Sequence, residues 1–196
     1  MTETLEEITE QEIPKLSRRE TILNFARHLP LFYIPASVIA KPIIKGQNPV
    51  DYWTQDPAEM VMAVAGLTIA GIGAFLKQTN DESEMKTICA NLQSDNPSMV
   101  ETGAYRHTRH PCYSAQTLIA TGFAVLSPAI DTGIALATYL GLTQNCAKAE
   151  ERKNLAQFGD RYKEYMGKVP RWPVISKIPE WLASTTKYFS RKEAQP

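Results

Sequence analysis

The apolar residues of this chain are concentrated in long runs that polar segments separate. Residues 29–44 carry no charge before Lys41, although three prolines interrupt this run, and residues 60–76 contain no charged side chain. Prolines argue against a helix in water, but helices in a bilayer tolerate kinks when neighbouring helices satisfy the freed backbone groups. Both runs are therefore predicted to be membrane-spanning helices. A buried core helix of a soluble protein is the alternative for residues 60–76.

Small residues recur along the second run at intervals of four positions. One series is Gly66, Ala70 and Ala74, and a second contains Ala65 and Gly73. Because small side chains at this spacing let two helices approach closely in lipid, we expect this helix to pack tightly against a neighbour.

The third apolar region, residues 117–142, is broken by Ser127-Pro128 and by Asp131. Ser-Pro followed by Asp favours a turn. The region therefore predicts a tight hairpin of two helices over about 114–127 and 129–146. Together the runs predict an all-α, integral-membrane helix bundle of about four spans, followed by a cytoplasmic C-terminal helical segment.

The charges divide the chain into a polar N-terminal tail (1–28), a membrane domain (29–173) and an amphipathic C-terminal tail (174–196). Four spans would place 19 of the 21 Lys and Arg residues on one side and only Lys41 and Lys45 on the other. Because positive charge collects on the cytoplasmic side, we predict a multi-pass protein with both termini in the cytoplasm. The C-terminal tail would lie at the membrane interface or pack as an ordinary surface helix.

Composition excludes some function classes. The 21 Lys and Arg residues balance 21 Asp and Glu residues, so the overall charge indicates no nucleic-acid partner. The three cysteines, Cys89, Cys112 and Cys146, are far apart, which leaves no CxxC signature and no disulfide framework.

Polar and aromatic side chains are densest between Tyr105 and Tyr113, a stretch with two arginines, two histidines and two tyrosines. Such a cluster beside a membrane is costly unless it is solvated or binds something. Its two histidines, His107 and His110, are three residues apart and could face one metal. Because no Asp, Glu or Cys pattern completes a metal site, we predict no bound metal. Arg106 and Arg109 could instead anchor the helix end at lipid phosphates.

A second polar element begins with Glu150 and Glu151, where the last apolar helix meets water. Apolar and aromatic residues then follow at helical spacing through Tyr165. The alternative for the glutamate pair is a solvated helix face with Arg152 and Lys153 as partners.

Together the two elements resemble the integral-membrane methyltransferases of the isoprenylcysteine carboxyl methyltransferase and phospholipid N-methyltransferase group. Members of that group show a Gly-x-Tyr-Arg-x-x-Arg-His-Pro-x-Tyr element, a helical hairpin, a Glu-Glu pair, a Phe-Gly segment with two tyrosines and a Val-Pro-Arg-like ending. The matching residues are Gly103, Tyr105, Arg106, Arg109, His110, Pro111, Tyr113, Glu150, Glu151, Phe158, Gly159, Tyr162, Tyr165, Val169, Pro170 and Arg171.

The resemblance implies a helix bundle whose C-terminal segment closes a pocket for S-adenosylmethionine, and an enzyme that methylates a lipid or lipid-like small molecule arriving from the bilayer. It assigns to the cofactor site Met99, Val100, Gly103, Tyr105, His110, Pro111, Cys112, Tyr113, Glu150 and Glu151. A carboxylate can accept hydrogen bonds from the cofactor's ammonium or hydroxyl groups. Methyl transfer itself needs mainly alignment and exclusion of water, and no residue is assigned as a catalytic base.

The chain departs from the carboxyl-methylating relatives at one informative position. Those relatives carry an arginine about one turn before the first glutamate, where this chain has Cys146. Because arginine is the natural partner of a carboxylate, the substitution argues against a prenylcysteine carboxylate as substrate. It also leaves open a non-catalytic membrane scaffold that retains the fold. A third hypothesis is a redox enzyme with a similar helix bundle that binds a nicotinamide cofactor, although the sequence contains no Gly-rich phosphate loop. The substrate and the oligomeric state stay open.

Overall fold

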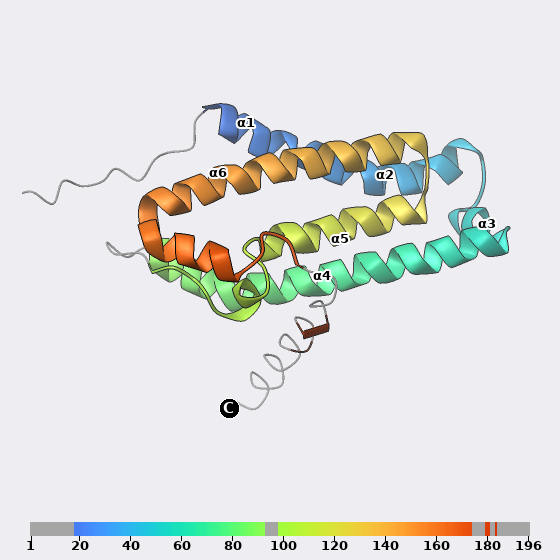
Figure 1. Cartoon of the computed structure of the whole chain (residues 1–196). Coiled ribbons are helices and arrows are strands. Elements are labelled where there is room, and N and C mark those ends of the chain that lie inside the picture. Colours follow the sequence, from blue (N-terminus) through green and yellow to red (C-terminus); the bar gives the residue numbers. More distant parts are fainter. Residues whose placement is uncertain (1–17, 93–97, 174–178, 181–182, 184–196) are drawn as a thin grey trace, which may run out of the picture.

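The computed structural model describes residues 18–92, 98–173, 179–180 and 183, and every regular element within them is helical (Figure 1). The elements are α1 (Arg18–Ala26), α2 (His28–Ile44), α3 (Pro49–Thr54), α4 (Pro57–Leu92), the 3₁₀ helix Gly103–Arg106, α5 (Pro111–Leu126) and α6 (Ile130–Lys168). The all-α prediction is confirmed for these residues. The first 17 residues and most of the amphipathic C-terminal tail lie outside the described residues.

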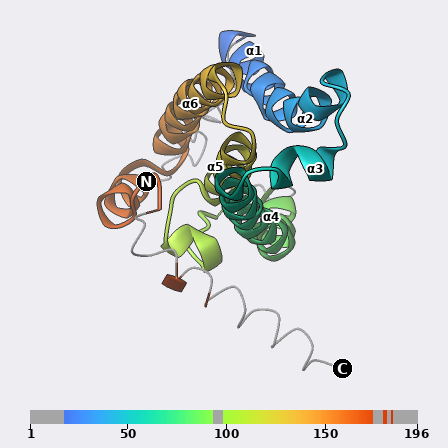
Figure 2. The same ribbon diagram turned by 90° about the vertical axis from the view of Figure 1, so that its right-hand side faces the viewer.

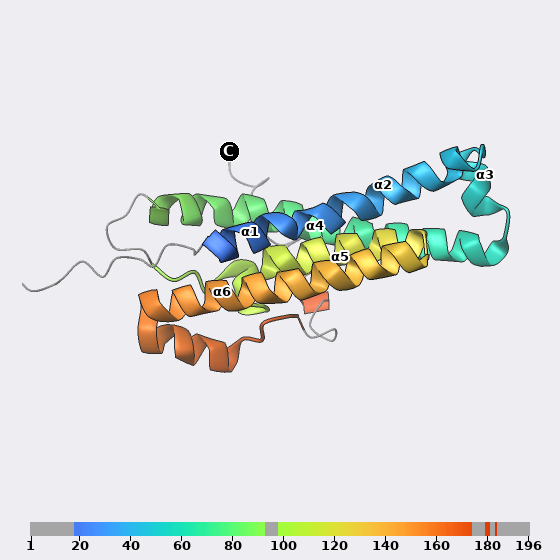
Figure 3. The same cartoon turned by 90° about the horizontal axis from the view of Figure 1, so that it is seen from above.

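Four long helices, α2, α4, α5 and α6, run side by side along one direction (Figures 1 and 3). Viewed end-on, α5 lies between the other three (Figure 2), and it contacts each of them. The short α3 lies at the end of the bundle where α2 passes into α4, and α1 continues the line of α2 at the opposite end.

Two helical stretches, Arg18–Ile44 and Pro57–Asn80, are long and apolar enough to cross a membrane. Only 22% of the most apolar window of each stretch is buried, and large apolar side chains such as Phe32 and Leu67 point outward. The core helix of a soluble protein would be mostly buried instead, because water disfavours a continuous exposed apolar surface. Both stretches therefore have the length, the composition and the exposed apolar surface of membrane helices.

Glycines bring α4 and α5 into backbone contact. A Cβ atom placed on Gly66 would lie 2.6 Å from the carbonyl oxygen of Gly122, and one placed on Gly73 would lie 2.7 Å from the amide nitrogen of Ile119. Real Cβ atoms essentially never approach so closely. The close helix packing predicted from the small residues of the second run is confirmed, and α5 is the partner.

The hairpin predicted from Ser127-Pro128 is confirmed, because α5 ends at Leu126 and α6 begins at Ile130. The hydroxyl of Thr132 stabilises the turn by accepting from the amide of Ala129 at 3.1 Å. The carboxylate of Asp131 accepts hydrogen bonds from Tyr33 at 2.8 Å and from Lys41 at 3.1 Å, which ties α2 to the hairpin.

The C-terminal part of α6 folds back on itself. Gly159 adopts φ 57° and ψ −131°, a conformation that favours glycine, and the chain reverses there (Figure 1, orange to red). In the return segment, residues 160–169, the side chains of Tyr162, Tyr165 and Val169 form a buried cluster. Met99, from the loop before α5, packs against this cluster. The reversal therefore brings the end of α6 onto the loop that leads into α5.

Candidate functional site

Glu151, on α6 before the reversal at Gly159, is a buried carboxylate held by two arginines. It is only 3% exposed, and its carboxylate accepts hydrogen bonds from Arg109 Nε at 2.9 Å and from Arg171 Nε at 2.9 Å. A second bond joins the Arg171 guanidinium to its other oxygen. Burial opposes ionisation, but the Arg171 hydrogen bonds and the charges of Arg109 and Arg171 outweigh it and hold the pKa of Glu151 below its usual value. A solvated helix face is therefore the wrong interpretation for Glu151.

Arg109 joins the loop before α5 to the chain after α6. One of its Nη atoms donates to the carbonyl oxygens of Met166 at 2.8 Å and Val169 at 2.9 Å, and its backbone N–H donates to Pro170 at 2.9 Å. These contacts are long-range and largely buried, so Arg109 does not serve as a lipid-phosphate anchor. With Glu151 and Arg171 it forms what we call the latch, which holds the end of α6 against the start of α5.

Glu150 lies next to the latch but is far more open, because 46% of its side-chain surface is exposed. The Tyr113 hydroxyl donates to one of its oxygens, and His110 Nδ1 lies 3.4 Å from the other. The His110 ring is stacked on Tyr113 with centroids 5.5 Å apart, and its Nε2 lies 3.3 Å from Glu151. His110 and Tyr113 therefore orient a carboxylate that is still accessible.

Arg27, at the junction between α1 and α2, contributes a buried cation to the same region. The guanidinium carbon of Arg27 lies 4.2 Å from the centre of the Tyr113 ring, and its N–H groups donate to Asn24 at 2.8 Å and Gln116 at 3.1 Å. Cys146 and Glu150 line a small hollow beside it, of about 30 Å³. Sequence reasoning missed Arg27, since its only signal was a position just before the first apolar run.

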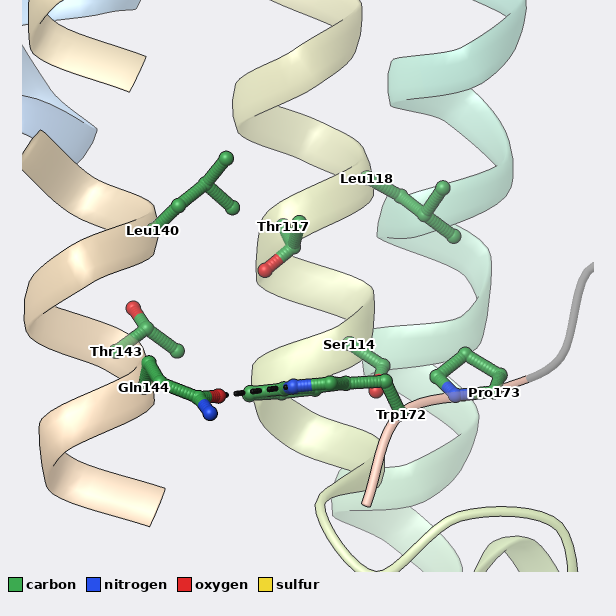
Figure 4. Close-up of a pocket in the computed structure, with 8 residues that line it drawn as sticks. All are labelled: Ser114, Thr117, Leu118, Leu140, Thr143, Gln144, Trp172 and Pro173. Carbon is green, nitrogen blue, oxygen red and sulfur yellow. Dashed lines mark hydrogen bonds between the residues drawn. The ribbon is translucent and has the colours of Figure 1, made fainter. Parts of the chain in front are cut away.

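An apolar cavity of about 370 Å³ lies between α5 and α6, beside this polar region; we call it the slot. Its lining residues are Ser114, Thr117, Leu118, Leu140, Thr143, Gln144, Trp172 and Pro173, none of which carries a charge. Figure 4 shows the indole of Trp172 lying across one end of the slot, where its Nε1 donates to Gln144 at 3.0 Å. The Trp172 ring also lies 5.9 Å from the His110 ring, centre to centre. Trp172 therefore borders the slot and also contacts His110, which orients Glu150.

The residues predicted for the cofactor site fall into two neighbouring groups. His110, Tyr113, Glu150 and Glu151 meet at the start of α5, together with the buried Pro111 and the half-buried Cys112. Met99 and Tyr105 lie against the return segment, where the Tyr105 carbonyl accepts from Tyr165 at 2.7 Å. Gly103 begins the 3₁₀ helix in this loop with φ 61°, and Val100 precedes it. Their contact with a cofactor stays a prediction.

Among the described residues, no three His, Cys, Asp or Glu side chains are grouped so that they could hold a metal ion. Sequence reasoning also missed Gln144 and Thr143 as lining residues of the slot. Both lie within an ordinary apolar helix pattern, which carries no signal for a cavity.

Comparison with known proteins identifies the family of this chain. Neither the curated proteins nor the solved structures include a significant match to this chain. A family model described as "Protein of unknown function (DUF1295)" matches residues 16–169, which is most of the chain. This range contains the bundle, Glu150 and most of the latch. The chain therefore belongs to the DUF1295 family, which lies in the steroid 5-alpha reductase/ICMT-like membrane superfamily.

Proposed function

We propose that this protein is an S-adenosylmethionine-dependent methyltransferase that acts on a lipid or lipid-like small molecule at the membrane. One observation carries the proposal: an accessible carboxylate, oriented by His110, and an uncharged slot adjoin at Trp172, which lines the slot and lies 5.9 Å from the His110 ring. A polar cofactor and an apolar acceptor need such a pair of adjoining environments. The slot, at about 370 Å³, is within the range of about 300–1,000 Å³ that ligand pockets occupy.

The residues around Glu150 suit the chemistry of this cofactor, which supplies an activated methyl group when bound. The Glu150 carboxylate can accept hydrogen bonds from an ammonium group or from ribose hydroxyls. The face of Trp172 favours a nearby positive charge such as a sulfonium. The apolar walls of the slot exclude water from an acceptor held there, which methyl transfer requires.

For the membrane arrangement, the proposal includes four crossings by α2, α4, α5 and the first half of α6, with both termini in the cytoplasm. The charge distribution supports it, because Lys41 and Lys45 are the only cations at the α3 end among the residues that the structure describes. Single-cysteine variants at Asn48 and Asp160 would test it with a membrane-impermeant thiol reagent on intact cells. Labelling at position 48 and not at position 160 is expected, and the reverse contradicts the orientation.

Calorimetry on the purified protein in detergent tests the cofactor assignment. Wild-type protein is expected to bind S-adenosylhomocysteine, and Glu150→Gln to bind it about tenfold or more weakly, since a charge-assisted hydrogen bond is worth about 1.5–3 kcal/mol. Glu164→Gln, an exposed glutamate farther along α6, serves as the matched control and should keep wild-type affinity. Absence of binding by the wild type, or wild-type affinity in Glu150→Gln, contradicts the proposal.

The same purified protein can be used to distinguish two alternative functions, a reductase and a non-catalytic scaffold. The superfamily name includes a reductase, so NADPH is titrated in parallel; binding of NADPH without binding of S-adenosylhomocysteine would favour a reductase. Cys146 in place of an arginine motivates the scaffold alternative. Cofactor binding without methyl transfer to any lipid extract, followed as a mass shift of one methyl group, would favour that alternative.

A further inference from the structure

A second cavity lies at the α3 end of the bundle, away from Glu150 and the slot; we call it the α3 pocket. Its volume is about 180 Å³, and it is lined by Tyr52, Trp53, Ala58, Glu59, Met62, Leu126, Ser127 and Pro128. These residues come from α3, the start of α4 and the turn between α5 and α6, which meet at this end of the molecule (Figure 1). Pockets for whole small-molecule ligands measure about 300–1,000 Å³. The α3 pocket therefore suits one part of a larger molecule.

Two aromatic rings and one carboxylate define the chemistry of the α3 pocket. The rings of Tyr52 and Trp53 are nearly perpendicular, at 80°, with centroids 5.9 Å apart. The exposed carboxylate of Glu59 lines the same pocket and makes no hydrogen bond or ion pair with any residue that the structure describes. Aromatic faces and a carboxylate both attract a positive charge, and none of the described lining residues is basic. The lining therefore favours a cationic group.

The chain itself places a cation against one of these rings. The Lys45 Nζ lies 4.9 Å from the centre of the Tyr52 ring and 3.4 Å from its hydroxyl oxygen. Lys45 is exposed, and within the described residues it has no carboxylate partner. Because its charge is not neutralised, it is available to an anionic group at the edge of the pocket. The aromatic pair thus has an unpaired cation and an unpaired carboxylate as neighbours.

The α3 pocket lies where the apolar surface of α4 begins. Glu59 directly precedes the uncharged run 60–76, and Met60 and Val61 at the start of this run are 47% and 63% exposed. This helix is long and apolar enough to cross a membrane, so these side chains suit contact with acyl chains. Tyr and Trp collect at the level of the lipid headgroups. A lipid covering the start of α4 would therefore have its headgroup beside the pocket.

We propose that the α3 pocket binds the headgroup of a zwitterionic phospholipid. The ammonium group would lie against Tyr52 and Trp53 with Glu59 nearby, and the phosphate would lie near Lys45. An anionic phospholipid supplies the phosphate but offers no cation to the rings and the carboxylate. Since the pocket is at the opposite end of the bundle from Glu150, it is not the site proposed for methyl transfer. The inference goes beyond the methyltransferase proposal and does not depend on it.

Native mass spectrometry of the purified full-length protein tests the headgroup preference. The protein in detergent is mixed with equal amounts of phosphatidylcholine and phosphatidylglycerol that carry identical acyl chains, so that only the headgroup differs. The first bound lipid is expected to be phosphatidylcholine, with a preference of about fivefold. The factor is modest because cation–π contacts and ion pairs at accessible sites are weak.

Glu59→Gln should lower the preference to about twofold or less, because it removes the charge that faces the ammonium group. Asp51→Asn is the matched control: it removes one negative charge from an exposed position on α3 that does not line the pocket, and it should keep the wild-type preference. Trp53→Leu should also lower the preference; Glu59, being exposed, provides the test if this variant does not fold. Lys45→Gln should weaken both lipids by a similar factor, since both carry the phosphate.

Three outcomes overturn the proposal. They are equal binding of the two lipids by the wild type, an unchanged preference in Glu59→Gln, and an equal loss of preference in Asp51→Asn, which would indicate a general charge effect. Binding of S-adenosylhomocysteine is measured on the same samples and should not differ between Glu59→Gln and the wild type. A loss of cofactor binding in Glu59→Gln would contradict a separate site at the α3 end.

Discussion

Replacing Glu151 by glutamine keeps the shape of the side chain but removes the charge from the centre of the latch. Arg109, whose side chain is 9% exposed, then lacks its carboxylate partner, and Arg171, at 24%, loses its charged partner and one of its two hydrogen bonds, because the amide keeps only one acceptor oxygen. Removing one partner of a buried ion pair costs about 3–5 kcal/mol. Arg109 keeps two carbonyl acceptors, and Arg171 is partly hydrated. We therefore expect Glu151→Gln to lower the local stability by about 3 kcal/mol, the lower end of this range.

The loss of stability should be confined to the return segment, which the latch holds against the start of α5. Hydrogen exchange followed by mass spectrometry, on protein in detergent, should show amides of the return segment exchanging about a hundredfold faster in Glu151→Gln, since about 3 kcal/mol of local opening free energy corresponds to that factor. Amides in α4 and α5 should be unchanged. Glu164→Gln, a surface change within the return segment, is the control and should leave exchange near wild type. Unchanged exchange in the return segment, or equal acceleration throughout the bundle, would refute the latch.

Three further predictions follow from local geometry. Gly122→Leu should prevent α5 from packing on α4 and greatly reduce the yield of monodisperse protein in detergent, whereas Gly133→Ala, with open space around the position, should not. Gly159→Ala should loosen the reversal of α6, because alanine tolerates φ 57° poorly; faster proteolysis of the return segment would reveal this, and wild-type resistance would contradict it. The lowered pKa of Glu151 means that its stabilisation is complete above its ordinary value of 4.5 and is lost as the pH falls through the lower native pKa. A proteolysis-resistance profile should therefore decline below pH 4.5 in the wild type and be flatter in Glu151→Gln.

Local signals predicted much of the fold. The run 29–44 corresponds to α2, the run 60–76 lies within α4, and the turn at Ser127-Pro128 separates α5 from α6. Hydrophobic periodicity and turn chemistry act between residues close in the chain, so one sequence is enough to reveal them. The four-residue spacing of Gly66 and Ala70 also predicted a close helix contact, although the partner helix was not specified.

The sequence predicted the structure of the return segment only in part. Gly159 is visible in the sequence as an interruption of an apolar pattern, but its φ and ψ, and hence the reversal of α6, depend on what the following residues pack against. Tyr162 and Tyr165 find that surface in the loop around Met99, more than 60 positions earlier in the chain. No local pattern carries such a pairing.

By itself, the sequence determined the helical content, the hairpin, the apolar surfaces and the presence of a glutamate pair beside a cluster of histidine, tyrosine and arginine. Only the tertiary structure decided that the two glutamates differ: Glu151 is enclosed by two arginines, while Glu150 is open. It also decided that Trp172 closes an uncharged slot beside Glu150. The physical reason is that burial and charge pairing depend on which distant segments share an interface, whereas helix formation depends mainly on near neighbours.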